Sequence, residues 1–366
     1  MANSFVLSHS EVSRLLASVH LPTFLKELVE EIERAYGDPT LESIERTGWI
    51  RTPDTLEIMG CQAQDFTCIK VISSNPSLAD TLIPTVTGTL VCTDVTTDEA
   101  RLICDAAILT SLRTAASTAV VLRRATPHAA TLGVIGAGLE GACHALVLAI
   151  LLPSIQRICF TDVEPAKAAD AVAQVTTLLS RETEIKDRGI EVKSIDAANG
   201  KSVFESDAIV TATYGTTEVV RSTESLRAGT TIAAVGADLQ GKRELGYRIY
   251  DKARFVADDL SQCLHEGELE VAKRRLRVDM DEKSHRGVLQ GGRIMGVADL
   301  LENETSFFAR KEPLIVYDST GFSGQDLAIA RVVLRHLEAQ DWQPSVWNPS
   351  NAVPLPRLLG RDEYSS

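Results

Sequence analysis

Residues 131–141 read TLGVIGAGLEG, and the fold class follows from them. A short apolar strand, TLGVI, leads into Gly136, Gly138 and Gly141 in the spacing G-x-G-x-x-G, and a helical segment follows. The first glycine permits a tight turn, the second lets the backbone approach a pyrophosphate, and the third allows close packing of helix on strand. Unpaired N–H groups at the helix start favour an anion. The stretch therefore predicts the first turn of a dinucleotide-binding Rossmann sheet.

The acidic residue after the next strand bears on which dinucleotide is bound. The strand RICFT at 157–161 is followed by Asp162. A carboxylate at this place accepts hydrogen bonds from ribose hydroxyls and repels a 2′-phosphate. We therefore expect NAD as the cofactor, with NADP disfavoured. The simpler alternative is a glycine-rich turn with an ordinary surface aspartate, and the strand and helix that flank the turn argue against it.

Strands and helices alternate after this turn, which predicts a parallel, doubly wound α/β sheet. The expected helices are 139–152 and 164–181, and the expected strands are 157–161, 190–194, 208–212, 231–235, 253–256 and 314–317.

The upstream part of the chain has a different pattern. Short runs rich in Val, Ile and Thr are separated by Gly, Pro, Asn and Asp, which predicts an antiparallel sheet. Its expected strands are 49–59, 66–72, 86–93 and 100–104. Ser8 and Glu11 form a capping-box pattern before a first helix, and further helices are expected at 22–36, 106–124 and 324–339. The fold class is therefore a Rossmann sheet plus a second, α+β domain.

Composition excludes several classes of protein. The chain of 366 residues has a formal net charge of −13, which argues against a nucleic-acid partner. Its seven cysteines form no CxxC pair, so we expect buried, reduced thiols and no metal site. No secretory signal and no membrane-length apolar run is present. We expect a soluble cytoplasmic protein without a membrane partner.

Two cationic residues stand in apolar surroundings. Lys70 lies within CIKVI, and Arg113 lies within LRTAA. Such charges are rarely buried without a partner. From the residues alone, each could extend to solvent or form a structural salt bridge, and this remains open.

The chain resembles the ornithine cyclodeaminase/μ-crystallin family along nearly its whole length. The order and spacing of several segments match, and they are LEIMG (56–60), IKVISSNP (69–76), SLRTAA (111–116), GVIGAG (133–138), AVGADLQGKREL (234–245) and YDSTGF (317–322). The resemblance implies a Rossmann domain at 126–313. It also implies a substrate-binding and dimerisation domain at 1–125, completed by 323–366, in a homodimer.

The resemblance also implies roles for individual residues. Arg46, Lys70 and Arg113 would hold the α-carboxylate of a small amino acid, with Glu57 and Met59 lining the same pocket. Asp238 would meet the substrate amine as the catalytic carboxylate, with Lys70 as the second catalytic residue. A turn-forming aspartate after a strand is the simpler reading of Asp238. The implied cofactor contacts are Thr85, Thr114, Gly136, Gly138, Leu139, Glu140, Asp162, Lys242 and Ser319.

The chain departs from the family pattern at two points. Position 140 is Glu where the family usually has Gln, and a carboxylate near a pyrophosphate is unfavourable. The chain is also longer than a typical cyclodeaminase, with extra residues at 182–189, 273–292 and after 342. Side-chain specificity could therefore differ.

The function expected from this resemblance is NAD-dependent conversion of a diamino acid, L-ornithine, to the cyclic imino acid L-proline with release of ammonia. One alternative is an NAD(P)-dependent amino-acid dehydrogenase, or a reductase of cyclic imines. The other is a non-catalytic binding protein of the μ-crystallin kind. Asp238 favours cyclodeamination, because plain alanine dehydrogenases of the family tend to lack an aspartate there.

Overall fold

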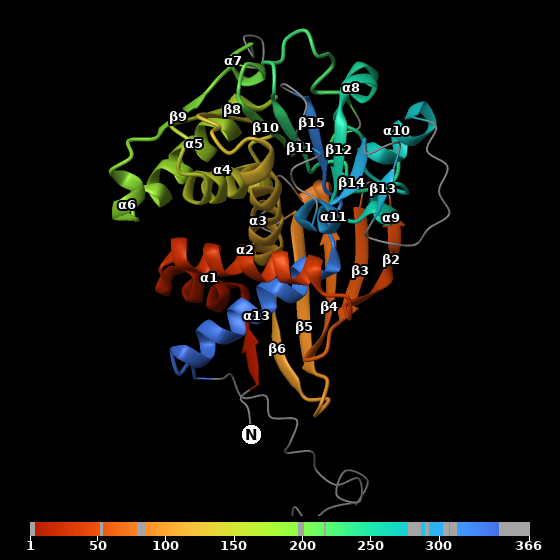
Figure 1. The fold of residues 1–366 in the computed structure, drawn as a ribbon. Helices are drawn as coiled ribbons and strands as arrows, with labels where there is room; N and C mark the ends of the chain where they lie inside the picture. Colours follow the sequence, from red (N-terminus) through yellow and green to blue (C-terminus); the bar gives the residue numbers. More distant parts are fainter. Residues whose placement is uncertain are drawn as a thin grey trace, which may run out of the picture.

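The computed structural model contains two β-sheets joined by long helices (Figure 1). It describes residues 4–51, 54–78, 85–196, 201–215, 217–276, 287–289, 293–302, 307 and 313–343. The predicted contribution of residues 344–366 to the second domain lies outside the described residues.

The first sheet has six strands in the order β1-β6-β5-β4-β3-β2. Neighbouring strands pair antiparallel except for the first pair, because the short β1 runs parallel to β6. The strands are β1 (Phe5–Leu7), β2 (Glu42–Arg51), β3 (Asp54–Gln62), β4 (Phe66–Ser74), β5 (Val86–Asp94) and β6 (Ala100–Asp105). The predicted antiparallel sheet is therefore confirmed.

One predicted strand is wrong. The sequence pattern gave a single strand at 49–59, whereas β2 and β3 form a hairpin in which Ile50 pairs with Thr55 and Arg51 with Asp54. Apolar residues lie in both strands of the hairpin, so the sequence pattern resembled one continuous strand. Pro53 was the overlooked signal, because proline interrupts a strand.

The second sheet has nine strands in the order β13-β14-β12-β15-β11-β10-β7-β8-β9. All of its pairs are parallel except β13 with β14, so the predicted doubly wound sheet is confirmed. Its strands are β7 (Thr131–Ile135), β8 (Arg157–Thr161), β9 (Glu191–Ser194), β10 (Ala208–Thr211), β11 (Thr231–Ala234), β12 (Arg254–Ala257), β13 (Val288–Leu289), β14 (Ile294–Gly296) and β15 (Ile315–Asp318). Because β15 is a central strand, this sheet continues beyond residue 313, where the predicted Rossmann range ends.

Two helices join the sheets into one structure. Helix α3 (Ala107–Ala125) is buried along most of its length and packs against α4 (Leu139–Leu151) on the nine-stranded sheet. Helix α13 (Ser323–Ala339) follows β15, returns across β3, β4 and β5, and packs on α2 (Leu21–Gly37). Figure 1 shows α13 in blue beside the red α1 (His9–Ser18) and α2. The C-terminal helix thus belongs to the core of the N-terminal sheet.

The remaining helices are shorter, apart from α5, which packs against β8 and β9. They are η1 (Pro76–Leu78), α5 (Pro165–Leu179), α6 (Thr183–Lys186), α7 (Lys201–Phe204), α8 (Tyr247–Lys252), α9 (Leu260–Cys263), α10 (Glu268–Leu276) and α11 (Val297–Glu302). None of the helices in the described ranges has the length and apolarity needed to cross a bilayer.

The period-2 alternation of β4 determines where its lysine points. Cys68 and Lys70 face inward, whereas Ile69 and Val71 face outward. Since α13 covers the inner face of this sheet, Lys70 is only 1% exposed. All seven cysteines are free and buried, as expected.

The glycine turn after β7 is constrained at one position and open at another. Gly136 has φ +98°, and a Cβ there would overlap the Ala212 carbonyl. Gly138 is the N-cap of α4 with φ −74°, and a Cβ there would meet no atom within 4 Å. The first glycine is therefore required by the fold, whereas the second leaves open space at the helix N-terminus.

We expect Gly136→Ala to destabilise the chain by about 1–3 kcal/mol, because a side chain at positive φ is strained and this one also meets backbone. Gly138→Ala is the matched control, and its free energy of unfolding should stay within about 0.5 kcal/mol of the wild type. Urea unfolding of both variants measures this. Equal stability of the two variants would contradict the geometry.

Candidate active site

The glycine turn and Asp162 lie against each other at the carboxyl ends of β7 and β8. Asp162 Oδ2 accepts the N–H of Ala137 at 2.7 Å, and its Oδ1 accepts the N–H of Glu164 at 2.9 Å. Leu139, the first residue of α4, is about half exposed. The open space at Gly138 and the free helix N-terminus fit a diphosphate, and the adjacent carboxylate fits a ribose.

A buried cluster of three charges lies between β4, α3 and α13. Lys70 Nζ is 2.9 Å from Asp326 Oδ1, and Arg113 Nε donates to the same oxygen at 3.0 Å. All three side chains are at most 4% exposed. Burial and the Arg113 charge lower the pKa of Lys70 to about 8, against the opposing effect of Asp326. Lys70 therefore remains a cation at neutral pH.

Gln325 holds the other end of Arg113. The Gln325 Oε1 accepts a hydrogen bond from Arg113 Nη1. Its Nε2 donates to Tyr36 Oη at 2.8 Å and to Ser117 Oγ at 3.0 Å. The Arg113 guanidinium is thus oriented by two residues of α13.

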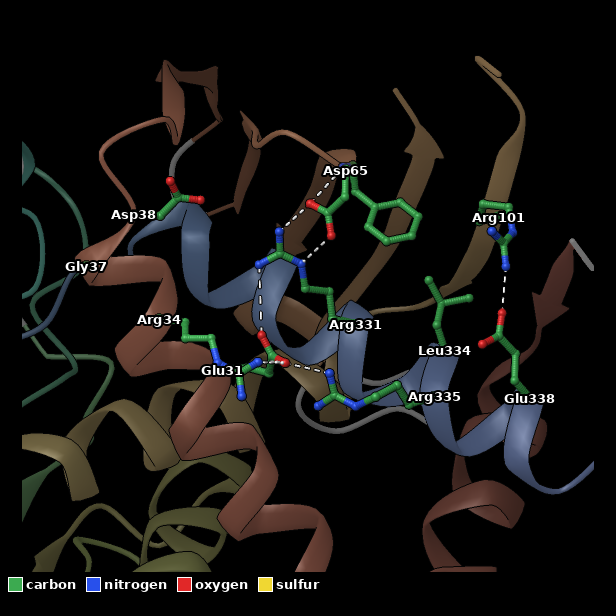
Figure 2. Close-up of a pocket in the computed structure, with 11 residues that line it drawn as sticks. Glu31, Arg34, Gly37, Asp38, Asp65, Arg101, Arg331, Leu334, Arg335 and Glu338 are labelled. Carbon is green, nitrogen blue, oxygen red and sulfur yellow. Dashed lines mark hydrogen bonds and ion pairs between the residues drawn. The ribbon is translucent and has the colours of Figure 1, made fainter. Parts of the chain in front are cut away.

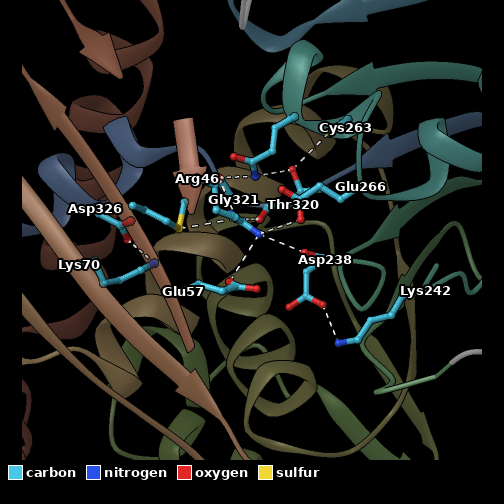
Figure 3. A network of polar contacts seen from close by, with 12 residues as sticks. Arg46, Glu57, Lys70, Asp238, Lys242, Cys263, Glu266, Thr320, Gly321 and Asp326 are labelled. Atoms are coloured by element: carbon cyan, nitrogen blue, oxygen red, sulfur yellow. Dashed lines mark hydrogen bonds and ion pairs between the residues drawn. The ribbon is translucent and has the colours of Figure 1, made fainter. Parts of the chain in front are cut away.

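Arg46 of β2 reaches the same region but is held mainly by backbone oxygens. Its Nη1 donates to the Asp238 carbonyl at 3.0 Å, and its Nη2 donates to the carbonyls of Thr320 and Gly321. Its Nε is buried and has no hydrogen-bond partner among the described residues. In Figure 3 Arg46 lies between the Lys70–Asp326 pair and the Asp238–Lys242 pair.

Gly321 is the point where two of the guanidinium groups meet. A Cβ at this glycine, which has φ +97°, would lie 3.0 Å from Arg113 Nη1 and Nη2 and 3.2 Å from Arg46 Nη2. Lys70 joins them through the Asp326 oxygen that it shares with Arg113. The structure therefore brings together the three cations that the sequence proposed for a carboxylate, and the lack of a side chain at 321 makes room for them.

Carboxylates surround the Arg46 side of this region. Glu57 Oε2 and Glu266 Oε2 are each 3.6 Å from Arg46 Nη1. Burial raises the pKa of Glu57, and it raises the pKa of Glu266 to about 7 despite the neighbouring Arg46. Asp238 Oδ1 pairs with Lys242 Nζ at 2.8 Å, and its side chain is 45% exposed. The Asp238 carboxylate is therefore the most accessible of the three.

Glu140 occupies the first turn of α4 and is directed toward the charged cluster. Burial raises the pKa of Glu140 to about 7, against the opposing effects of Ser111, Arg113 and Lys70. The raised pKa makes Glu140 easier to protonate than an ordinary carboxylate, which reduces its repulsion of a diphosphate at the adjacent turn.

The other residues proposed from the sequence are placed as follows. Met59 is buried, with its Sδ 3.6 Å from Arg46 Nη2, and Lys242 Nζ lies over the Tyr214 ring. Thr114 donates to the Thr110 carbonyl within α3. Ser319 donates to Asp258 at 2.9 Å, and Thr85 is exposed beside η1, with its carbonyl accepting the N–H of Asn75. These contacts fix local structure and do not bring Thr85, Thr114 and Ser319 into the charged cluster.

Three residues of the site were not predicted from the sequence, namely Asp326, Gln325 and Glu266. Gln325 and Asp326 are adjacent in the buried first half of α13, SGQDLAIA, where Asp326 is the one charged residue, and a buried carboxylate needs cationic partners. Lys70 and Arg113 were the cations without an assigned partner, so the residue types suggested a pairing, but no local pattern shows which acid approaches them. Glu266 follows α9 in a polar segment and gave no comparable signal.

A separate hollow of about 780 Å³ lies between α2 and α13 (Figure 2). Its arginines are already matched by acids. Arg331 pairs with Asp65, and Arg335 pairs with Glu31. None of the residues proposed from the sequence for substrate or cofactor lines it, so it is not the candidate active site.

Buried carboxylates support the loops behind the charged cluster. Glu244 accepts hydrogen bonds from Thr211, Thr213 and the Gly236 N–H. Glu268 accepts the Glu244 N–H at 2.6 Å and the Tyr250 hydroxyl at 2.5 Å. Burial raises the pKa of Glu268 to about 8, so this residue is protonated in the folded chain at neutral pH.

We expect this proton to make stability depend on pH. A raised folded-state pKa means that the folded chain binds the extra proton between about pH 4.5 and 8, so this stabilisation is lost as pH rises through that window. Glu268→Gln keeps an acceptor for the Glu244 N–H, presents an amide N–H to the Tyr250 oxygen as a protonated carboxyl would, and removes the titration. Urea unfolding at pH 5.5 and pH 8.5 should show a smaller loss of stability in the variant. An equal loss in both proteins would contradict the assignment.

Comparison with known proteins gives a consistent set of relatives. The family model for the ornithine cyclodeaminase/mu-crystallin family matches residues 9–341. Alanine dehydrogenase of Archaeoglobus fulgidus is 30% identical over 279 residues, which cover 76% of this chain and 79% of that protein. L-lysine cyclodeaminase of Streptomyces rapamycinicus is 27% identical over 340 residues, which cover 90% and 91%.

Solved structures agree with these matches. A lysine cyclodeaminase, solved to explain recognition of L-lysine, L-ornithine and L-2,4-diaminobutyric acid, has a TM-score of 0.78 at 27% identity and covers 94% of this chain and 96% of its own. An archaeal alanine dehydrogenase dimer with bound NAD has a TM-score of 0.77 at 24% identity and covers 93% and 98%. The second likeness supports the fold.

Proposed function

The chain is an enzyme that belongs to the ornithine cyclodeaminase/mu-crystallin family, and we propose that it is an NAD-dependent cyclodeaminase. The proposed substrate is a diamino acid, L-ornithine, and the products are L-proline and ammonia. One observation carries this proposal. Three carboxylates, those of Asp238, Glu57 and Glu266, surround Arg46 in one polar cluster that also contains the Lys70–Asp326 pair (Figure 3).

The cationic side of the cluster suits the substrate α-carboxylate. Lys70 and Arg113 share one carboxylate oxygen, so together with Asp326 they carry a net charge of about +1. A single bound carboxylate neutralises that charge. Arg113 offers a planar guanidinium with a fixed orientation, which would fix the Cα of the substrate as well as its carboxylate.

The acidic side suits a substrate with a second amine. L-Alanine has only a methyl group beyond Cα, and a site for it would be apolar there. Here Glu57 and Glu266 flank Arg46, and Asp238 is accessible. Carboxylates attract an ammonium group and accept its hydrogen bonds, which favours a diamino acid over alanine.

The glycine turn, the α4 N-terminus and Asp162 would hold the dinucleotide. Their geometry fits a diphosphate beside the open face of Gly138, and Asp162 favours NAD over NADP. When bound, NAD supplies reversible removal of the hydride at the substrate Cα.

The residues of this chain would direct the remaining chemistry. Lys70 and Arg113 hold the carboxylate, so that the side-chain amine can fold back onto Cα. Asp238 takes a proton from the δ-ammonium, and the free amine then forms the ring as ammonia leaves Cα. Lys242 pairs with the Asp238 carboxylate at 2.8 Å and Arg46 binds the Asp238 main-chain carbonyl, so this residue is held from both sides.

A homodimer is part of the proposal. Ile44, Trp49, Ile69 and Val71 are exposed on strands β2 and β4. Ile69 and Ile44 both pair with Gly60, from opposite sides of β3, so they share the outer face of the six-stranded sheet. An exposed apolar face of this kind supports an interface, and the related archaeal alanine dehydrogenase is a dimer.

The experiment is incubation of the enzyme with L-ornithine and NAD⁺, with proline, ammonia and NADH measured separately. We expect proline and ammonia in equal amounts with no lasting NADH, and weaker turnover with NADP⁺. Asp238→Asn should lower kcat by about 10²–10⁴-fold, the usual contribution of a positioned acid–base group. Its affinity for NADH should be unchanged.

Three outcomes would contradict the proposal. Accumulation of NADH indicates an amino-acid dehydrogenase. NADH consumption with a cyclic imine, and no reaction with ornithine, indicates a reductase. Binding without turnover of any amino acid indicates a μ-crystallin-like binding protein.

A further inference from the structure

We propose that Asp326 is a positioning residue for the reaction, which keeps Lys70 a cation and aims it at the substrate carboxylate. The proposal rests on the proposed role of Lys70 as a carboxylate ligand. Asp326 lies on α13 and is not one of the site residues expected from the sequence. Its proposed role is to act through Lys70 without touching the substrate.

One carboxylate oxygen of Asp326 contacts both buried cations. Asp326 Oδ1 lies 2.9 Å from Lys70 Nζ and 3.0 Å from Arg113 Nε. Asp326 Oδ2 is buried and has no hydrogen-bond partner among the described residues. A single oxygen therefore compensates both buried cations.

The position of Asp326 in its helix favours the charged form of its carboxyl group. The residue lies in the first turn of α13, whose N-cap is Phe322. An anion is stabilised at that end of a helix. Arg113 and Lys70 also hold the pKa of Asp326 below its ordinary value, although burial alone would raise it. Asp326 is thus a permanent anion over the working pH range.

Lys70 and Arg113 would respond unequally to removal of the Asp326 charge. A guanidinium does not lose its proton in proteins, whereas a buried lysine does so readily. Arg113 also keeps its hydrogen bond to Gln325, which is itself fixed by Tyr36 and Ser117. Removal of the Asp326 charge would therefore act mainly on Lys70, which would become a neutral amine beside Arg113.

Charged groups face Lys70 from five elements. They are Asp326 on α13, Arg113 on α3, Arg46 on β2, Glu57 on β3 and Glu140 on α4. Among the described residues, Asp326 is the only one of the three acids that accepts a hydrogen bond from Nζ, so it contributes most to holding the proton.

The test compares Asp326→Asn with the wild type and with Asp65→Asn. Asp65 also pairs with α13, through Arg331 at 3.0 Å, but it lies in the exposed hollow of Figure 2. The readout is the affinity of the enzyme–NADH complex for L-proline between pH 6 and pH 10. Wild type and Asp65→Asn should lose affinity as the pH rises through about 8, where Lys70 loses its proton.

In Asp326→Asn this alkaline loss should move to lower pH by about one unit or more, a tenfold change in the protonation equilibrium. NADH affinity should stay within about twofold, because the helix and glycine turn are unchanged. An unshifted alkaline loss would overturn the proposal. If no amino acid binds the wild type at any pH, the proposed function fails, and the next measurement still decides the role of Asp326.

That measurement is a double-mutant cycle on urea unfolding with Lys70→Met, Asp326→Asn and the double variant. The double variant retains a net charge of +1 from Arg113, as in the wild type, whereas Asp326→Asn alone must either confine two cations or remove the proton of Lys70 and leave a buried amine without its carboxylate partner. We expect the double variant to be more stable than Asp326→Asn, or to fold where the single variant does not. A double variant no more stable than Asp326→Asn would show that Asp326 serves the helix and would overturn the proposal.

Discussion

A buried lysine and a buried arginine must share a counter-ion, and the only one that hydrogen-bonds both among the described residues is Asp326 on the C-terminal helix. An uncompensated charge in such a site costs several kcal/mol. The chain therefore has to return from the last strand of the nine-stranded sheet to the inner face of the six-stranded sheet. This return packs α13 against β4. It also brings the segment that precedes α13, Thr320 to Phe322, beside Arg46. The same packing that satisfies the charges creates the junction between the two sheets.

At this junction, binding groups come from both sheets. Lys70 and Arg46 come from the six-stranded sheet, Asp238 and Lys242 follow β11, and Glu140 starts the helix after β7. Gly321 lies beside the guanidinium groups of Arg46 and Arg113, and only a residue without a side chain leaves space for both at that point. The charged cluster therefore depends on a conformation at 321 that most residues adopt poorly. A hydride-transfer site at such a junction can orient a carboxylate from one side and a dinucleotide from the other.

The sequence was most informative where pattern and chemistry coincide. The strand–glycine–helix stretch at 131–141 predicted the parallel sheet, and the apolar surroundings of Lys70 and Arg113 identified both as charges that need a partner when buried. The β2–β3 turn was missed because apolar residues flank it, and β1 was missed because its three residues form a strand only through pairing with β6. The partner of Lys70 and Arg113 was missed because it is 213 residues beyond Arg113. Such a contact is fixed by the return of α13, which no local pattern expresses.

The most direct measurement is a crystal structure of the enzyme with NADH and L-proline. The proline carboxylate should lie within hydrogen-bond distance of Lys70 Nζ and the Arg113 guanidinium, with Asp238 toward the ring nitrogen and the Lys70–Asp326 contact intact. A proline bound in the hollow between α2 and α13, or one whose carboxylate contacts neither Lys70 nor Arg113, would contradict the central claim that this cationic pair is the carboxylate site.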